Sequence, residues 1–475
     1  MAPEPYRPVS YLEWNAARRG SSLAVWDAGE EITFEELLAH VRRMQRALAA
    51  KGIRAGDVVG VQLPNIWQYV ALELAIPDLG AVIVPLPTGL GEHEIRWITE
   101  KTRPALVIDR ARAEELAVTS ADGLPAPPSA APDPDRVVEV ALTSGTTGTP
   151  KLAALSARLK QVTFESSTAR LGITEGDRVL PMTPLTQGIG GMCLYCLRVG
   201  AGLVMLGDAR WTPERCLDIA GRAQASVMVG VPTNVIRMLN HPFRPATSLR
   251  LVAVAGAPMP PEIAERWETS TGIAISSFYG SMDAGQLAVA SPSDPQAVRW
   301  MTVGRPHDLA EWTILDPEGR PVKPGDTGEI CMRGDLVQER YWGEDSGPYS
   351  SDGWAHMGDL GFVDDAGYLH IVGRVKDIII RGGMNINPHE VESIVRAHPG
   401  VVDVCVVGRP HPDLGEVPVA FVVGELTQRD LERFLEQRGL AGYKWPEEVH
   451  LLDELPLSGP GKVNRKVLSE HARAL

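Results

Sequence analysis

The stretch of this chain that is best equipped for chemistry is Thr143-Ser144-Gly145-Thr146-Thr147-Gly148-Thr149-Pro150-Lys151. Its glycines let backbone N–H groups turn toward an anion, its hydroxyls add donors, and its lysine brings a positive charge. It is not a Walker A loop, because that motif needs Ser or Thr after the lysine and Leu152 stands there. The stretch predicts a loop that holds a polyphosphate; the alternative is a solvated turn.

Further chemically capable residues are spread along the chain in a fixed order. They comprise Gly256-Ala257-Pro258, then Tyr279-Gly280-Ser281-Met282-Asp283, then Asp359 in a turn-rich region, then Arg374 and Lys376, then Gly383, and finally Lys462. Taken singly, Asp359 and Gly383 would be turn residues, and Lys462 would be a solvated lysine. Tyr279 alone would be a core residue. Only the order in which these residues occur along the chain favours functional roles for them.

The elements that must position these residues alternate between strand and helix. Apolar runs typical of strands lie at 57–63, 81–85, 105–109, 137–142, 202–206, 225–229 and 251–255, and helical patterns lie at 34–51, 66–79, 92–101, 213–223 and 261–270. This alternation predicts an α/β fold with two mostly parallel sheets covered by helices. A connector rich in Pro and Ala at 123–135 precedes the phosphate loop.

The pattern of predicted secondary structure changes twice after residue 300. Short strands and turns between 302 and 372 predict a small antiparallel β subdomain. The residues after Arg374 predict a small α+β domain. Its expected elements are a strand at 378–380, the turn Gly382-Gly383, a helix capped by Asn387, strands at 401–407 and 417–423, a helix at 431–437 and a loop bearing Lys462. We therefore expect an N-terminal domain at 1–373 and a C-terminal domain at 374–475, a typical domain size.

Composition excludes several classes of function. The 475 residues are 44% hydrophobic and 22% charged, as in soluble globular proteins, and the net charge of −14 argues against a nucleic-acid partner. No run of apolar residues is long enough for a bilayer, so no membrane partner is expected. Five scattered cysteines suit a reducing cytoplasm, and Cys193 and Cys196 lack the second ligand pair of a zinc site.

Read together, the phosphate loop and these later motifs resemble the adenylate-forming superfamily, which contains acyl-CoA synthetases, luciferases and peptide-synthetase adenylation domains. The resemblance extends from residue 32 to Lys462. It implies a large N-terminal lobe with a mobile C-terminal cap. It also implies two half-reactions: a carboxylate attacks ATP to give an acyl-adenylate and pyrophosphate, and the thiol of CoA then displaces AMP. Both steps depend on positioning and on stabilising charge.

The resemblance also implies roles for individual residues. The phosphates would be held by Thr143, Ser144, Gly145, Thr146, Thr147, Gly148 and Lys151. The adenine slot would be lined by Gly256, Ala257 and Pro258, and Tyr279, beside Gly280 and Ser281, would stack on the base. The ribose would be contacted by Asp359 and Arg374. Lys376 would be the hinge of the cap, Gly383 would border the pantetheine tunnel, and Lys462 would meet the carboxylate and the α-phosphate. The implied small molecules are ATP or acyl-AMP, CoA and Mg²⁺.

Two positions depart from the superfamily pattern, which has Thr and Glu where this chain has Met282 and Asp283. Asp283 is the expected Mg²⁺ ligand with a shorter side chain, and Met282 lacks a hydroxyl donor. We therefore hypothesise that adenylation is weak or lost while thioester formation survives, in which case a partner ligase would supply the adenylate. Lys462, whose superfamily role is in adenylation, is evidence against this hypothesis.

The acid is expected to be a non-amino, largely apolar carboxylic acid. No acidic residue that could hold an ammonium group lies at 182–191 or 227–237, and the predicted substrate-binding residues are Gln187, Gly188, Val231 and Gly280. Two alternatives stay open: transfer of the acyl group to a carrier protein, and a non-catalytic protein that binds an acyl-adenylate or nucleotide.

Overall fold

The computed structural model describes residues 3–120, 125–143, 151–207, 211–241, 248–282, 284–458 and 462–474. Two groups of predicted site residues lie outside these ranges: the central residues of the phosphate loop, Ser144, Gly145, Thr146, Thr147 and Gly148, and the metal-ligand candidate Asp283.

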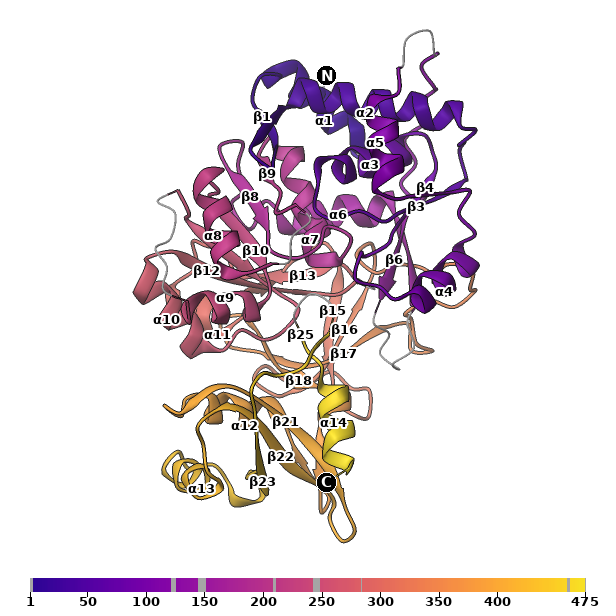
Figure 1. The fold of residues 1–475 in the computed structure, drawn as a ribbon. Coiled ribbons are helices and arrows are strands. Elements are labelled where there is room, and N and C mark those ends of the chain that lie inside the picture. The colour runs from indigo at the N-terminus through magenta and orange to yellow at the C-terminus, as the bar shows by residue number, and fades with distance from the viewer. Residues whose placement is uncertain are drawn as a thin grey trace. The chain divides into compact units, whose positions relative to one another are not determined.

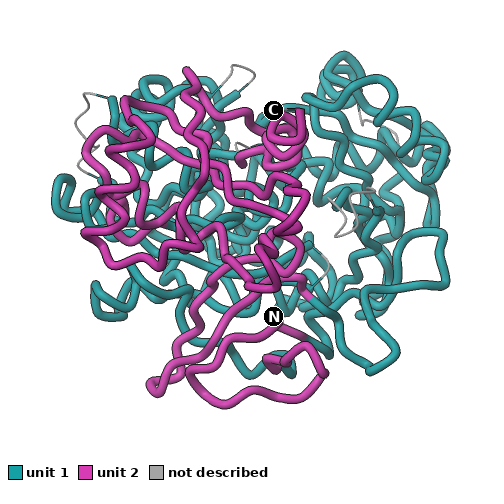
Figure 2. The backbone as a smooth tube through the Cα atoms, turned by 90° about the horizontal axis from the view of Figure 1, so that it is seen from below, with its two compact units in different colours: residues 1–259, 264–312, 332–356 teal, residues 260–263, 313–331, 357–475 magenta. Residues whose placement is uncertain are grey.

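The backbone divides into two compact units, which are described separately (Figure 2). The first contains residues 1–259, 264–312 and 332–356, and the second contains residues 260–263, 313–331 and 357–475. The division passes through a four-stranded sheet made of β15 (Glu311–Leu315), β16 (Gly328–Arg333), β17 (Ala355–Val363) and β18 (Leu369–Arg374).

The larger sheet of the first unit holds, among the described residues, nine strands (Figure 1). In sheet order they are β14 (Arg305–Pro306), β13 (Gln286–Val289), β12 (Ala274–Gly280), β11 (Leu251–Val254), β10 (Val227–Gly230), β8 (Arg178–Pro181), β9 (Gly202–Val204), β1 (Leu23–Asp27) and β2 (Glu30–Thr33). Neighbours from β12 to β1 are parallel, and the outer pairs are antiparallel. The central strands are buried apolar runs, as expected for strands covered on both faces.

The second sheet of the first unit carries the predicted phosphate-loop region. Its order is β5 (Leu106–Ile108), β3 (Val58–Val61), β4 (Val82–Pro85), β6 (Val137–Thr143) and β7 (Lys151–Ser156). The first four strands are parallel, whereas β6 and β7 are antiparallel. The ladder closes on the pair Thr143 and Lys151, so the two ends of the predicted loop lie opposite each other.

Helices of the first unit surround these sheets. They are α1 (Pro8–Arg19), α2 (Phe34–Ala50), α3 (Trp67–Asp78), α4 (Glu92–Thr102), α5 (Arg110–Val118), α6 (Ala157–Ser167), α7 (Gly188–Met192), η1 (Cys193–Val199), α8 (Pro213–Arg222), α9 (Pro232–Leu239), α10 (Pro261–Thr271) and α11 (Gln296–Met301). Helix α2 begins with a capping box: the Thr33 hydroxyl accepts from the N–H of Glu36, and the Glu36 carboxylate accepts from the N–H of Thr33. Helix α6 contacts both β7 and β13, and so links the two sheets.

The C-terminal part of the second unit is an α+β arrangement. Its strands are β20 (Met384–Ile386), β19 (Ile379–Arg381), β22 (Gly415–Gly424), β21 (Val401–His411) and β23 (Glu448–Leu452), with β24 (Leu457–Ser458) paired to β25 (Lys462–Val463). Its helical segments are η2 (Val375–Asp377), α12 (Pro388–Arg396), α13 (Gln428–Gln437), η3 (Gly442–Lys444) and α14 (Arg465–Ala474). Buried apolar side chains of α12, α13, β21 and β22 form its core.

The predicted α/β class is confirmed, as are the parallel strands and the cap of α12, where Asn387 accepts from the N–H of His389 at 3.0 Å. One local prediction was wrong. Lys462 begins the short strand β25 rather than lying in a final loop, and helix α14 follows it. Among the described residues, no helix combines the length and the apolar character that crossing a bilayer requires.

Candidate nucleotide and acyl site

The Lys151 end of the predicted phosphate loop is held by a neighbouring segment of the first unit. The Lys151 ammonium lies over the Tyr341 ring, 4.2 Å from its centre, a cation–π contact. Ala153 forms a β-bridge with Tyr341, and the N–H of Trp342 donates to the carbonyl of Leu152 at 2.7 Å. Segment 341–342 therefore fixes the start of β7, and Tyr341 is a residue that sequence reasoning missed.

The predicted adenine-binding residues lie at the carboxyl ends of two adjacent parallel strands. Strands β11 and β12 pair in register, with Val254 opposite Ser277, so Gly256 and Tyr279 each follow by two residues. Gly256 has φ of +83°, which an L side chain rarely adopts, while Ala257 and Pro258 are exposed and Tyr279 is 8% exposed. The carboxyl end of parallel strands is where ligands usually bind in α/β sheets.

The segment that joins β8 to α7 ends at the predicted acyl-binding residue Gln187, and the next predicted residue, Gly188, is the first residue of α7. Asn65 organises this segment, because its amide donates to the carbonyl of Thr183 at 3.0 Å and accepts from the N–H of Leu185 at 2.8 Å. A Cβ on Gly190 would lie 2.1 Å from the carbonyl oxygen of Pro184, so a glycine is required for this packing.

Gly188 lies against Met282, the residue that replaces threonine in the superfamily pattern. A Cβ added at Gly188 would lie 2.5 Å from the Met282 sulfur, so the thioether occupies the space beside the glycine. Val231 immediately precedes the neighbouring helix α9, and its N–H donates to Asn234 Oδ1 at 2.9 Å. Gly280 lies against Gln286, because a Cβ at Gly280 would lie 2.7 Å from Gln286 Cα.

The second unit brings together three predicted residues from distant parts of the sequence. Asp359 on β17 and Arg374 on β18 are cross-strand partners, and Arg374 Nε lies 3.0 Å from Asp359 Oδ1. Lys462 is close enough to both residues to interact with them electrostatically. Burial is the main cause that lowers the pKa of Lys462, the positive charge of Arg374 lowers it further, and the negative charge of Asp359 opposes this shift. The group combines a carboxylate acceptor with two cationic donors.

The predicted hinge follows directly on this pair. Lys376 is exposed in the short segment η2. A Cβ at Gly373 would lie 2.7 Å from Asn387 Oδ1, and the Asn387 amide donates to the carbonyl of Val372, so the cap residue of α12 also packs on the end of β18. Asn387 was predicted as a helix cap, but this second contact has no sequence signal.

Gly383 sits in a tight turn between β19 and β20. Gly382 and Gly383 have φ of +56° and +81°, the pattern of a two-residue hairpin that favours glycine. Among the described residues, no atom lies within 4 Å of a Cβ built on Gly383. The backbone conformation, rather than crowding, thus requires this glycine.

A buried ionic group close to the phosphate-loop strands was missed from the sequence. Lys160 on α6 contacts both Glu73 on α3, at 2.9 Å, and Glu139 on β6, and these side chains line a small cavity. Burial is the main cause that raises the pKa of Glu73 to about 7, and the negative charge of Glu139 adds to this shift while Lys160 opposes it. The sequence feature that could have indicated this ionic group is a single glutamate, Glu73 or Glu139, inside each of two otherwise apolar runs. A buried glutamate implies a buried cation as its partner.

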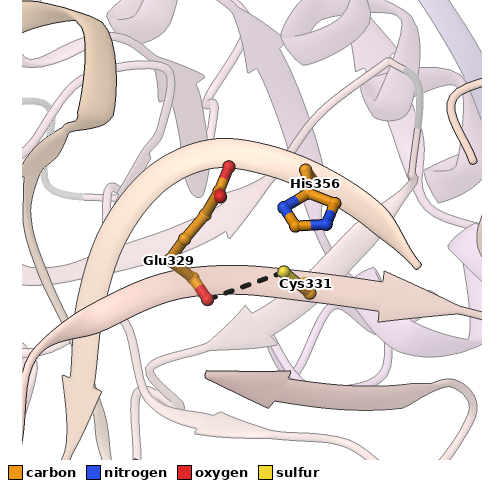
Figure 3. A group of neighbouring side chains, drawn as sticks. All are labelled: Glu329, Cys331 and His356. Carbon is orange, nitrogen blue, oxygen red and sulfur yellow. Dashed lines mark hydrogen bonds between the residues drawn. The ribbon is translucent and has the colours of Figure 1, made fainter. Parts of the chain in front are cut away.

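On strands β16 and β17, Glu329, Cys331 and His356 bring ligand-type atoms within 4.8 Å of one another (Figure 3). These side chains already make local hydrogen bonds. The Cys331 thiol donates to the carbonyl of Glu329 at 3.7 Å, Glu329 Oε1 accepts from the N–H of Gly358 at 3.1 Å, and His356 Nε2 lies 2.9 Å from Asp352 Oδ2. We therefore interpret the group as part of the sheet structure.

Comparison with known proteins identifies the class of this chain. Residues 12–342 match the family model described as AMP-binding enzyme, and residues 390–462 match the AMP-binding enzyme C-terminal domain. The chain belongs to the AMP-binding enzyme family.

Curated relatives and solved structures refine this result. The chain is 34% identical over 464 residues to a feruloyl-CoA synthase from Amycolatopsis sp, covering 93% of this chain and 94% of the relative. It is 32% identical to a sulfoacetate–CoA ligase from Cupriavidus necator, covering 94% of each. It also resembles the o-succinylbenzoate CoA synthetase of Bacillus subtilis in complex with its acyl-adenylate, with TM-score 0.85, 28% identity and 98% of each chain covered. The protein is an acyl-CoA ligase, an AMP-forming acid–thiol ligase.

Proposed function

We propose that this ligase forms the CoA thioester of a non-amino, largely apolar carboxylic acid, with a thioester-forming step that is faster than its adenylation step. A partner ligase would then supply acyl-adenylate for the second step. The observation that carries the proposal is the contact between Met282 and Gly188. A thioether that packs into the acyl site offers no hydroxyl donor to a phosphate, which weakens stabilisation of the charge that develops during adenylation.

The proposed acid follows from the chemistry around this contact. Gly188, Val231 and Met282 offer apolar surface, and no carboxylate that could pair with a substrate ammonium appears in the described segments 182–191 and 227–237. A buried ammonium without a partner is costly, so α-amino acids should be poor substrates.

The proposed division of roles uses both units. In the first, Lys151 with the phosphate-loop residues would bind the phosphates, and Gly256, Ala257, Pro258, Tyr279, Gly280 and Ser281 would bind adenosine. In the second, Asp359 would accept from the ribose hydroxyls, Arg374 would support it, and Lys462 would contact the carboxylate. The C-terminal domain would turn near Lys376 between the half-reactions, and Gly383 would then border the path of the CoA thiol.

Mg²⁺ would be held at Asp283, where it would neutralise phosphate charge. Because Asp283 lies outside the described residues, no step of the proposal depends on the ion. A cytoplasmic enzyme is part of the proposal, because the five scattered cysteines suit a reducing compartment.

The experiment compares the two half-reactions with one panel of acids. Pyrophosphate release is measured with ATP and each acid, and CoA thioester formation is measured by mass spectrometry with each preformed acyl-adenylate. We expect the second rate to exceed the first by at least about a hundredfold, the scale expected when a catalytic group is misplaced by about 1 Å. Similar rates would refute the impaired adenylation but leave the ligase intact.

A pair of variants separates a site effect from a general one. The double variant Met282→Thr with Asp283→Glu should raise pyrophosphate release by at least about tenfold, the scale of one restored hydrogen bond. Met301→Thr, which changes a 57% exposed methionine, is the matched control and should alter neither rate. Replacing CoA by an acyl carrier protein as acceptor tests the alternative of transfer to a carrier.

A further inference from the structure

Lys160 connects the two antiparallel strands between which the predicted phosphate loop lies. Its helix, α6, begins directly after β7, the strand that starts at Lys151. Its ammonium contacts Glu139 on β6, the strand that ends at Thr143. One buried ion pair therefore ties the strand that enters the loop region to the helix that follows the strand leaving it.

The connection from Lys160 back to Lys151 has no flexible segment. Strand β7 ends at Ser156 and α6 begins at the next residue. The Ser156 hydroxyl caps the helix, because it accepts from the N–H of Leu159 at 3.2 Å. A displacement of α6 is therefore passed directly to β7 and to the lysine at its start.

Glu139 occupies a position where β6 is paired on both sides. It lies opposite Ile83 of β4 and Leu155 of β7. From Glu139 onward, the ladder between β6 and β7 runs without a shift in register to its last pair, Thr143 and Lys151. An interaction that holds Glu139 in place therefore also sets where this last pair lies.

The ion pair is strong because it is shielded from water. The side chains of Lys160 and Glu139 are 17% and 11% exposed. Burial alone would lower the pKa of Lys160, but the negative charges of Glu139 first and Glu73 second raise it well above its usual range, so the ammonium is charged at neutral pH. Glu73 shares in compensating the charge but lies on α3, outside the two strands.

The last pair of the ladder offers donors to an anion. Thr143 is 5% exposed, and its Oγ1 makes no hydrogen bond within the described part of the chain. A buried hydroxyl without a partner usually has a functional reason. Opposite it in the ladder stands Lys151, whose ammonium lies over the Tyr341 ring. A hydroxyl and an ammonium suit the phosphates of a nucleotide.

We infer that Lys160 is a positioning residue for ATP: by pairing with Glu139, it holds Thr143 and Lys151 where they bind the β- and γ-phosphates. This inference rests on the proposed function, which gives these two residues their phosphate-binding role. AMP and an acyl-adenylate lack the β- and γ-phosphates. The ion pair should therefore matter for ATP binding and not for AMP binding or for thioester formation from a preformed adenylate.

Glu139→Gln and Glu73→Gln are a matched pair of variants that tests this role. Each replaces one carboxylate by an amide of similar size and leaves Lys160 the other carboxylate, but only Glu139→Gln weakens the tie to β6. Isothermal titration calorimetry with ATP and with AMP, both with Mg²⁺, measures the effect. Glu139→Gln should weaken ATP binding by at least about fivefold, the lower end of the usual coupling between separate positions.

The other readouts should stay at their wild-type values. Glu139→Gln should leave AMP binding unchanged, as well as the rate of CoA thioester formation from a preformed acyl-adenylate, because neither involves the β- and γ-phosphates. Glu73→Gln should leave ATP binding, AMP binding and that rate unchanged. If Glu139→Gln does not fold, Glu139→Asp takes its place, because it keeps the charge and only withdraws the carboxylate from Lys160. It should weaken ATP binding by at least about twofold, the small end of effects passed through packed neighbours.

Three results would overturn the inference. They are unchanged ATP binding in the Glu139 variant, an equal loss of ATP and AMP binding, and the same loss of ATP binding in Glu73→Gln. The last two would mean that the ion pair only stabilises the fold. A wild-type enzyme that binds AMP but not ATP would instead overturn the phosphate-binding role in the proposed function, and the inference with it.

Discussion

Replacing Lys160 by methionine should leave two buried carboxylates without their cation. The side chains of Glu73 and Glu139 are 8% and 11% exposed, and the Lys160 ammonium contacts both. Removing one partner of a buried ion pair costs about 3–5 kcal/mol because a charge is left uncompensated. Against a total stability of about 5–15 kcal/mol, this is a large loss.

Differential scanning calorimetry at pH 8 measures the effect. With a fall of about 2–4 °C for each kcal/mol, Lys160→Met should lower the Tm of the first unit by at least about 6 °C. Lys101→Met, which replaces an exposed lysine, is the control and should change Tm little. A Tm for Lys160→Met within 1 °C of wild type would refute the view that this lysine compensates buried charge.

The pH dependence of Glu73 gives a second check on the same group. Because the pKa of Glu73 is raised from 4.5 to about 7, the folded protein binds this proton more tightly than the unfolded chain. Its contribution to stability is therefore greatest below pH 4.5 and declines by on the order of 3 kcal/mol as the pH rises to 7. Glu73→Gln should remove this decline, so its Tm relative to wild type should increase between pH 5 and pH 8.

Two further variants test the second unit. Arg465→Met should cost about 3–5 kcal/mol, because Arg465 makes two hydrogen bonds of 2.6 and 2.7 Å to the buried Glu392. Burial would raise the pKa of Glu392, but Arg465 and His389 lower it, so this penalty should shrink as the pH falls below 4.5; a constant penalty in calorimetry would contradict it. Gly383→Ala should lower the free energy of unfolding by about 1–2 kcal/mol, because residue 383 has a φ of +81°, and it should also slow thioester formation. The control is Gly319→Ala: Gly319 has a φ of +78° and equally open surroundings, so the variant should lose the same stability without slowing thioester formation.

Local patterns predicted many of the central elements. The alternation of apolar runs predicted the parallel strands β3, β4, β5, β6, β9, β10 and β11 but not β8, and the sequence Asn387-Pro388 predicted the start of α12. These features depend on neighbouring residues, so one chain carries enough information about them. The final helix α14 was missed because Lys462 and its Gly- and Pro-rich surroundings predict a loop.

Contacts between distant residues could not be predicted in the same way. The Asp359 and Arg374 pair was expected from the superfamily resemblance, and the structure brings the two side chains together. By contrast, no local pattern indicates that Met282 would pack against Gly188, or that Lys160 would meet two glutamates from separate elements. Such contacts depend on how the sheets are connected, which a periodicity does not specify.

All five cysteines of this ligase are buried, and this matters for an enzyme that handles activated acyl groups. Burial raises the pKa of the thiols of Cys193, Cys196, Cys216 and Cys405. A thiol reacts as its anion, so these side chains are poor nucleophiles at neutral pH as well as shielded ones. An acyl-adenylate formed or received here thus meets no competing sulfur on these four residues, and CoA can be the acceptor without self-acylation of the enzyme at those positions.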